Sequence, residues 1–98
     1  MKIFSEQPTQ KNKIEAPTPK FPGGDKLVYG KRNSAIRIMQ EQLVKRGFEI
    51  EAKEMGKYGN STSSAVSMFY KSIGINSGTI VKDGKKFGFK AWERLFGD

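Results

Sequence analysis

Residues 58–69, which read YGNSTSSAVSMF, decide the fold that this chain can adopt. The opening tyrosine and glycine punctuate the chain, and Ser61 is suited to begin a helix because its hydroxyl can accept a hydrogen bond from a free backbone N–H group. Apolar side chains then recur at helical spacing until Gly74, a residue that commonly ends helices. The members of this apolar stripe are Ala65, Val66, Phe69 and Ile73. The pattern predicts an amphipathic helix with one face in a core.

A second stripe lies upstream and predicts an earlier helix. Asn33 or Ser34 can cap its start, and Gly47 stands where a left-handed stop is expected. Its apolar residues are Ile36, Met39, Leu43 and Val44. Its polar residues, which we expect on the other side of the helix, are Gln40, Glu41, Lys45 and Arg46.

A third, shorter helix is predicted to begin near Phe89. Its apolar face consists of Trp92, Leu95 and Phe96. The tripeptide at residues 86–88 (KFG) before this helix repeats the tripeptide at residues 57–59 (KYG) before the preceding one. In each copy we expect the aromatic side chain to pack down as a staple, and the glycine to let the backbone turn sharply into the helix. Three such helices can close one core.

The connecting segments lack helical periodicity. Residues 21–25 read as a turn, and residues 27–29 as a short extended stretch. Residues 75–86 are rich in Gly, Asn and Lys, which predicts a loop or a short hairpin. Asp83 and Gly84 within that loop resemble part of a calcium-binding loop, but the lysines on both sides of this single Asp would repel a divalent cation. We therefore interpret these two residues as a turn. We therefore expect no metal site and no cofactor.

Residues 1–22 read as an extended, Pro-rich arm in front of a domain at residues 23–98. The chain's four prolines all lie in this arm, and each one favours extended backbone around it. Its apolar residues, spaced like anchors, are Ile3, Phe4, Ile14 and Phe21. They could dock into pockets on a partner, or the arm could be plainly disordered while Phe21 covers an edge of the domain. Both interpretations stay open.

Composition narrows the class of function. The 98 residues include 18 Lys and Arg against 10 Asp and Glu, and the net charge of +8 favours an anionic partner. Cys and His are absent, which removes thiolate chemistry, the usual general base and the commonest metal ligand, so we expect no enzyme. Residues 1–7 lack the apolar run of a signal peptide, and no stretch approaches the roughly 20 apolar residues that span a bilayer, so no membrane partner is expected.

From about residue 21 to residue 96, the sequence resembles the peptidoglycan-binding domain family, a three-helix module of cell-wall hydrolases and phage endolysins. Residues 43–48 are similar to the end of the family's opening helix. Residues 58–69 resemble its aromatic-Gly-x-x-Thr-x-x-Ala-Val-x-x-Phe run, and residues 83–95 its Asp-Gly loop, second aromatic-Gly turn and closing helix. Tyr70 and Ala91 depart from it, standing where the family usually has Gln and Thr. The resemblance implies a mainly α, compact three-helix peptidoglycan-binding-like domain with an extended N-terminal arm.

The resemblance also implies a non-catalytic module that binds bacterial peptidoglycan, at the cell-wall surface or in a phage virion. Such a ligand calls for aromatic faces, hydrogen-bond donors and cations for stem-peptide carboxylates. The candidate residues are Tyr58, Tyr70 and Trp92 as platforms, Asn60, Ser61 and Thr62 as polar groups, and Lys57, Lys90 and Arg37 as cations. Each competes with a structural role in the core, in a helix cap or as a solvated charge. Tyr70 is expected to be exposed because it lies beside the apolar stripe.

Two rival functions remain. A wall-binding module normally travels with a hydrolase or a signal peptide, and this sequence shows neither. The chain could therefore be a phage structural protein, such as a capsid decoration or tail component, that attaches to neighbouring subunits through its arm. Nucleic-acid binding suits the net charge but is less favoured, because the basic residues are spread over all helices and interleaved with acidic ones.

Overall fold

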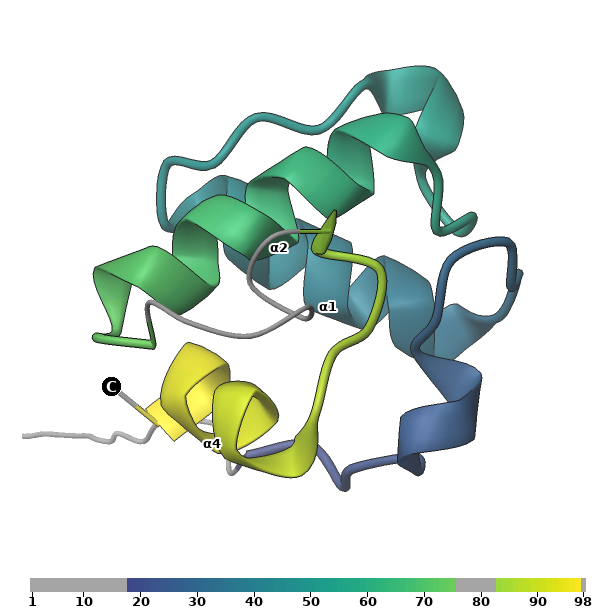
Figure 1. The fold of residues 1–98 in the computed structure, drawn as a ribbon. Coiled ribbons are helices and arrows are strands. Elements are labelled where there is room, and N and C mark those ends of the chain that lie inside the picture. The colour runs from purple at the N-terminus through teal and green to yellow at the C-terminus, as the bar shows by residue number, and fades with distance from the viewer. Residues whose placement is uncertain (1–17, 76–82, 98) are drawn as a thin grey trace, which may run out of the picture.

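The computed structural model of the chain describes residues 18–75 and 83–97. These ranges contain the helices α1 (Ser34–Lys45), α2 (Asn60–Ser72) and α4 (Phe89–Gly97), and the short 3-10 turns η1 (Gly24–Lys26) and η2 (Ala52–Glu54). In Figure 1, α1 runs behind α2 and α4 lies beneath them, and α1 contacts both of the other helices. No β-strand occurs in the described ranges, so the predicted mainly α, three-helix fold is confirmed. Most of the predicted loop at residues 75–86 lies outside them.

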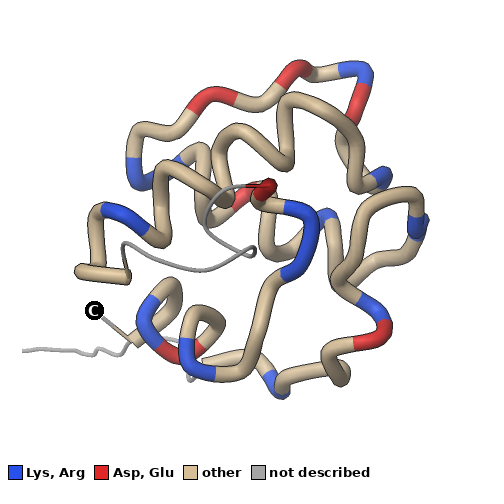
Figure 2. The backbone as a smooth tube through the Cα atoms, in the orientation of Figure 1, with Lys and Arg blue, Asp and Glu red and all other residues tan. Residues whose placement is uncertain are grey.

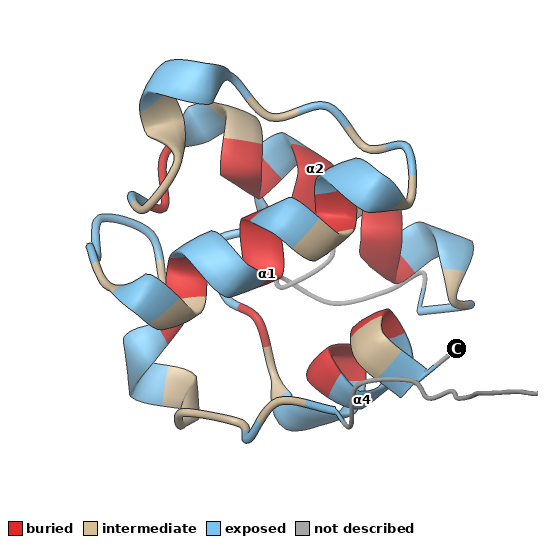
Figure 3. Cartoon of the chain, turned by 180° about the vertical axis from the view of Figure 1, so that it is seen from behind, coloured by how far each residue is buried: buried red, intermediate tan, exposed pale blue. Residues whose placement is uncertain are grey.

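The core lies where the apolar faces of the three helices meet, as the inward-facing buried segments in Figure 3 show. The predicted helix stripes supply most of it, namely Ile36, Met39, Leu43, Ala65, Val66, Phe69, Trp92 and Leu95. Leu27, Tyr58 and Phe87 from the connecting segments, with Tyr70 of α2 and Ala91 of α4, complete the core. Val44, predicted as a stripe residue, is 47% exposed, because it lies at the edge of the buried face of α1.

Helix ends follow the predicted signals at α1 and at the end of α2. The side chain of Asn33 accepts a hydrogen bond from the N–H of Ile36 at 2.9 Å, so Asn33 is the cap of α1. Gly47 and Gly74 follow α1 and α2 with φ of +98° and +91°, the left-handed conformation that glycine adopts without strain. Both predicted stops are confirmed.

A connecting segment, residues 27–32, joins the two loops that open α2 and α4. It pairs with these loops at Val28 and Arg32, but residues 28–31 form a turn that is closed by a bond from the N–H of Lys31 to the carbonyl of Val28 at 3.1 Å. The predicted extended stretch at residues 27–29 is therefore only partly right.

In the connecting segment, Gly30 donates to the carbonyl of Tyr58 at 2.8 Å on one side, and Tyr29 donates to the carbonyl of Lys85 at 2.9 Å on the other. These loops are far apart in sequence, and the connecting segment is one of the links that hold the starts of the two helices together.

The repeated tripeptide has a repeated role in this arrangement. Its two lysines, Lys57 and Lys86, each form an antiparallel bridge to the connecting segment. Its two aromatic residues, Tyr58 and Phe87, are fully buried beneath the helices they precede. The expectation that both aromatic side chains pack down into the core is therefore confirmed.

Two further contacts fasten α4. Arg46, at the end of α1, donates to the last carbonyls of α4, at 2.9 Å from the oxygen of Leu95 and 3.0 Å from that of Arg94. A cation is favourable there because a helix C-terminus carries partial negative charge. Arg46 therefore contacts α4 and does not simply face solvent as expected.

The chain also packs on α4 before residue 23. Nε1 of Trp92 donates to the carbonyl of Pro19 at 2.7 Å. The ring of Phe21 meets Trp92 and Phe89 edge-on, with centroid distances of 5.9 and 5.6 Å. Of the two roles left open for Phe21, the structure shows that it covers an edge of the domain. The other three proposed anchors, Ile3, Phe4 and Ile14, lie outside the described residues.

Candidate ligand-binding site

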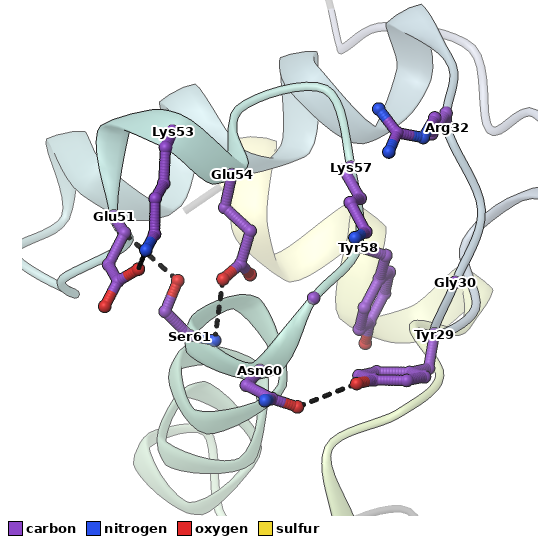
Figure 4. A pocket seen from close by; sticks show the side chains of 11 residues that line it. Tyr29, Gly30, Arg32, Glu51, Lys53, Glu54, Lys57, Tyr58, Asn60 and Ser61 are labelled. Carbon is purple, nitrogen blue, oxygen red and sulfur yellow. Dashed lines mark hydrogen bonds and ion pairs between the residues drawn. The ribbon is translucent and has the colours of Figure 1, made fainter.

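An open hollow of about 730 Å³ lies at the start of α2, between the connecting segment and η2. Figure 4 shows the side chains that line it. Its walls come from three parts of the chain, comprising Tyr29, Gly30, Arg32, Glu51, Lys53, Glu54 and residues 57–61. One wall is thus the beginning of the segment that decides the fold.

Glu54, at the end of η2, holds the start of α2. One carboxylate oxygen accepts the N–H of Ser61 at 3.1 Å, and the other accepts the N–H and the hydroxyl of Thr62, both at 2.8 Å. The N–H groups of Ser61 and Thr62 lie in the first turn of α2 and have no partner within the helix, so a carboxylate is favourable there. Burial is the largest single influence and raises the pKa of Glu54, but the hydrogen bonds from Thr62 and Ser61 together outweigh it and hold this pKa below its ordinary value.

The predicted cap at Ser61 is therefore wrong. Ser61 lies inside α2, and its hydroxyl accepts a hydrogen bond from the N–H of Glu51 at 3.1 Å. Gly59 precedes the helix with a φ of −114°, so it does not need the conformational freedom of glycine. It is required for space, because a Cβ at Gly59 would lie 2.6 Å from the carboxyl carbon of Glu54.

We expect Glu54→Ala to lower the free energy of unfolding by about 1–2 kcal/mol at neutral pH, as the loss of a helix cap does. Since the pKa of Glu54 is lowered by folding, its contribution is complete above the ordinary carboxyl pKa and is lost as pH falls through the folded-state value. The difference between wild type and variant in urea unfolding should therefore shrink below about pH 4. The exposed control Glu49→Ala should change stability by less than about 0.5 kcal/mol, and a pH-independent effect of Glu54→Ala would contradict the capping role.

The side chain of Gln40 holds the backbone next to the hollow in place. It is fully buried, and its Nε2 lies 2.8 Å from the carbonyl of Lys57, 3.1 Å from that of Glu54 and 2.9 Å from Oγ1 of Thr62. Its Oε1 accepts the N–H of Gly56 at 2.7 Å. The expectation that Gln40 faces solvent is wrong, because the irregular backbone between η2 and α2 has polar groups that need partners inside the protein.

Three of the candidate ligand-binding residues are buried. Tyr58 and Thr62 are fully buried and Trp92 is 1% exposed, so none of them offers a face to a ligand in this structure. Tyr58 borders the hollow, but its hydroxyl donates to the carbonyl of Gly84 at 2.6 Å. Burial raises the pKa of Tyr58 strongly, and the neighbouring Tyr70 raises it further. These side chains have the structural roles that were weighed against binding.

Tyr70 is also buried, and the expectation that it is exposed is wrong. Only 4% of it is accessible, and its hydroxyl donates to the carbonyl of Lys86 at 3.2 Å while accepting the N–H of Gly88 at 3.0 Å. Burial raises the pKa of this hydroxyl, although the bond from Gly88 opposes the rise. Tyr70 thus joins α2 to the loop that opens α4, which explains a tyrosine where the resembled family usually has Gln.

The remaining candidates divide between the hollow and other surfaces. Lys57, Asn60 and Ser61 line the hollow. Lys90 is exposed on α4 and is not part of the lining. Arg37 pairs with Glu41 at 3.2 Å along the exposed side of α1.

Several residues of the hollow were not among the candidates from the sequence, and Tyr29 and Arg32 are two of them. Tyr29 is 44% exposed, and its hydroxyl donates to Oδ1 of Asn60 at 2.8 Å. Nζ of Lys85 lies 4.9 Å from the centre of the same ring, a cation–π contact. A signal for Tyr29 is present in the sequence, because Tyr29 and Gly30 form a further aromatic-Gly pair.

The charges in the hollow are unevenly matched. Its lining has three cations, Arg32, Lys53 and Lys57, and two carboxylates, Glu51 and Glu54. Glu51 lies 3.7 Å from Lys53, and Glu54 is held by the start of α2. Within residues 18–75 and 83–97, neither Arg32 nor Lys57 has a carboxylate at ion-pair distance. Figure 2 shows that basic and acidic residues are interspersed along much of the backbone.

No family model, curated protein or solved structure matches this chain. Among the described residues, no three side chains of the His, Cys, Asp and Glu types gather to hold a metal ion. None of the helices in the same ranges has the length and apolarity needed to cross a membrane.

Proposed function

We propose that this chain is a non-catalytic module that binds bacterial peptidoglycan, with the hollow at the start of α2 as its binding site. One observation carries the proposal: residues 58–61, which begin the segment with the signature resemblance to peptidoglycan-binding domains, also form a wall of this hollow. The three-helix fold agrees with the same family.

The lining of the hollow suits a glycopeptide. The half-exposed ring of Tyr29 offers an apolar face for the C–H groups of a sugar. The exposed amide of Asn60 can donate hydrogen bonds to peptide or acetamido carbonyls. Arg32 and Lys57 add positive charge for an acidic ligand. Polar groups around one aromatic face are the usual make-up of a site that orients a ligand.

The lining also supports binding without cleavage. Its two carboxylates have partners, since Glu51 pairs with Lys53 and Glu54 caps α2. A general base must reach the proton that it removes, and a carboxylate held by three donors is poorly suited to that task. The chain has no His or Cys to replace them.

The test is co-sedimentation with purified peptidoglycan sacculi at low salt. We expect wild-type protein to sediment, and Tyr29→Ala to bind about tenfold more weakly because the sugar loses its stacking surface. Met68→Ala is the matched control, since Met68 is a 59% exposed side chain on α2 outside the hollow, and it should bind like wild type. Circular dichroism would verify that both variants are folded.

Two results would contradict the proposal. If wild type stays in solution under conditions in which an established peptidoglycan-binding module sediments, the function is wrong. If Tyr29→Ala and Met68→Ala both bind like wild type, the hollow is not the site.

A further inference from the structure

We infer that Arg32 and Lys57 form a carboxylate subsite, so that the module recognises peptidoglycan through the free carboxylates of its stem peptides. The inference rests on the proposed function and names the chemical group that the hollow selects. It concerns a pair of residues that only the folded chain brings together, because 25 positions separate them in the sequence.

Backbone pairing fixes the two residues opposite each other. Arg32 and Lys57 form an antiparallel bridge. The bonds that flank the bridge run from Tyr58 N–H to the Lys31 carbonyl at 2.9 Å and from Asn33 N–H to the Gly56 carbonyl at 3.2 Å. This arrangement makes Arg32 and Lys57 a non-hydrogen-bonded pair, in which Cα atoms are about 4.5 Å apart and side chains lie closest. The backbone therefore places two basic residues side by side.

The pair is unfavourable for the fold alone. Like charges placed directly opposite each other destabilise an antiparallel pairing. The carboxylates of the same hollow do not relieve this repulsion, since Glu51 lies beside Lys53 and Glu54 faces the start of α2. A bound anion between the two cations would remove the repulsion, so the pair has the properties of an anion site.

The geometry favours a carboxylate on a larger ligand. An arginine can bind both oxygens of a carboxylate through its planar fork, while a lysine adds a compact charge beside it. The lining has one more cation than carboxylates, which a single negative charge would balance. In Figure 4, Arg32 and Lys57 lie on one side of the hollow, and Tyr29 and Asn60 lie on another. One glycopeptide could therefore place a sugar on Tyr29 and a stem-peptide carboxylate at the pair.

The experiment compares two preparations of the same sacculi, one with free carboxyl groups and one with those groups converted to amides by carbodiimide and ammonia. At about 150 mM salt, where long-range attraction is largely screened, we expect wild type to bind the free form about tenfold more tightly than the amidated form. Arg32→Gln/Lys57→Gln should bind both forms equally, at the level of wild type on amidated sacculi.

A matched control separates the subsite from general charge attraction. Lys45→Gln/Lys71→Gln removes the same charge from exposed positions at the ends of α1 and α2, and it should keep the preference for free carboxyls. Thermal unfolding gives a second readout. Because removing the pair relieves repulsion, Arg32→Gln/Lys57→Gln should be at least as stable as wild type, so its loss of preference would not reflect unfolding.

Each outcome decides a different point. Equal, tight binding of wild type to both preparations would overturn the subsite and leave the proposed function standing. A preference retained by Arg32→Gln/Lys57→Gln, or lost by the control pair as well, would also overturn it. Absence of binding to either preparation would overturn the proposed function itself.

Discussion

Gly84→Ala should remove about 3–5 kcal/mol from the free energy of unfolding, out of the roughly 5–15 kcal/mol expected for a chain of this length. Gly84 has a φ of +64°, a conformation that costs a residue with a Cβ about 1–2 kcal/mol. A Cβ there would also lie 1.9 Å from the backbone oxygen of Ser63, in the first turn of α2. Backbone cannot move aside as a side chain does, so overpacking adds about 1–3 kcal/mol or more.

Gly74→Ala is the matched control. Gly74 also has a positive φ, +91°, but a Cβ there would meet nothing within 4 Å. Its substitution should therefore cost only about 1–2 kcal/mol, from the conformation alone. Urea unfolding followed by the fluorescence of Trp92, the single tryptophan, measures both variants. Equal losses at the two positions would show that Gly84 is not packed against α2 as described.

Gln40→Glu should be the second most damaging change, with a loss of about 3–5 kcal/mol at neutral pH. The substitution preserves shape but replaces the donating Nε2 with an oxygen that faces the carbonyls of Lys57 and Glu54 and Oγ1 of Thr62. A buried carboxylate surrounded by acceptors has no donor at that end. Gln42→Glu, on the same helix, is the control, because Gln42 makes a single 3.3 Å bond to the carbonyl of Leu95. It should cost less than about 1 kcal/mol.

The stability deficit of Gln40→Glu should depend on pH. Burial among acceptors raises the pKa of the introduced carboxyl above its unfolded value. Folding then favours the protonated form, which can donate one hydrogen bond, so the deficit relative to wild type is smallest at low pH. It should grow as pH rises above about 4, the ordinary carboxyl value, and level off above the folded-state pKa. A deficit that is constant from pH 3 to pH 7 would contradict the assigned contacts.

The helices could be predicted because their signals are local. Asn33, Gly47 and Gly74 mark helix ends through their own chemistry, and the apolar stripes repeat within a few turns. Gln40 and Tyr70 could not be placed in the same way. Each is a polar residue beside an apolar stripe, and each is buried because a distant loop supplies its hydrogen-bond partners. The spacing of residues along one helix gives no information about those loops.

Only some residues of the hollow could be predicted from the sequence, for the same reason. Lys57 and Asn60 were candidates because they belong to a recognisable segment. Arg32 was missed because its significance depends on lying opposite Lys57, a pairing made by backbone hydrogen bonds between segments remote in sequence. Tyr29 had a visible aromatic-Gly signal, but only its 44% exposure separates it from the buried aromatics at Tyr58 and Phe87.

The connecting segment at residues 27–32 has a consequence for biosynthesis. Its bonds to the loop that opens α2 can form once Tyr58 has been synthesised. Its bonds to the loop that opens α4 can form only after Lys85 and Phe87 have been synthesised. A nascent chain that already contains α1 and α2 therefore still has open backbone donors and acceptors and an incomplete interior. The domain can reach its native state only after α4, which supplies Trp92 and Leu95 to the core, has also been synthesised. A ribosome stalled before that point would present an aggregation-prone, protease-sensitive intermediate.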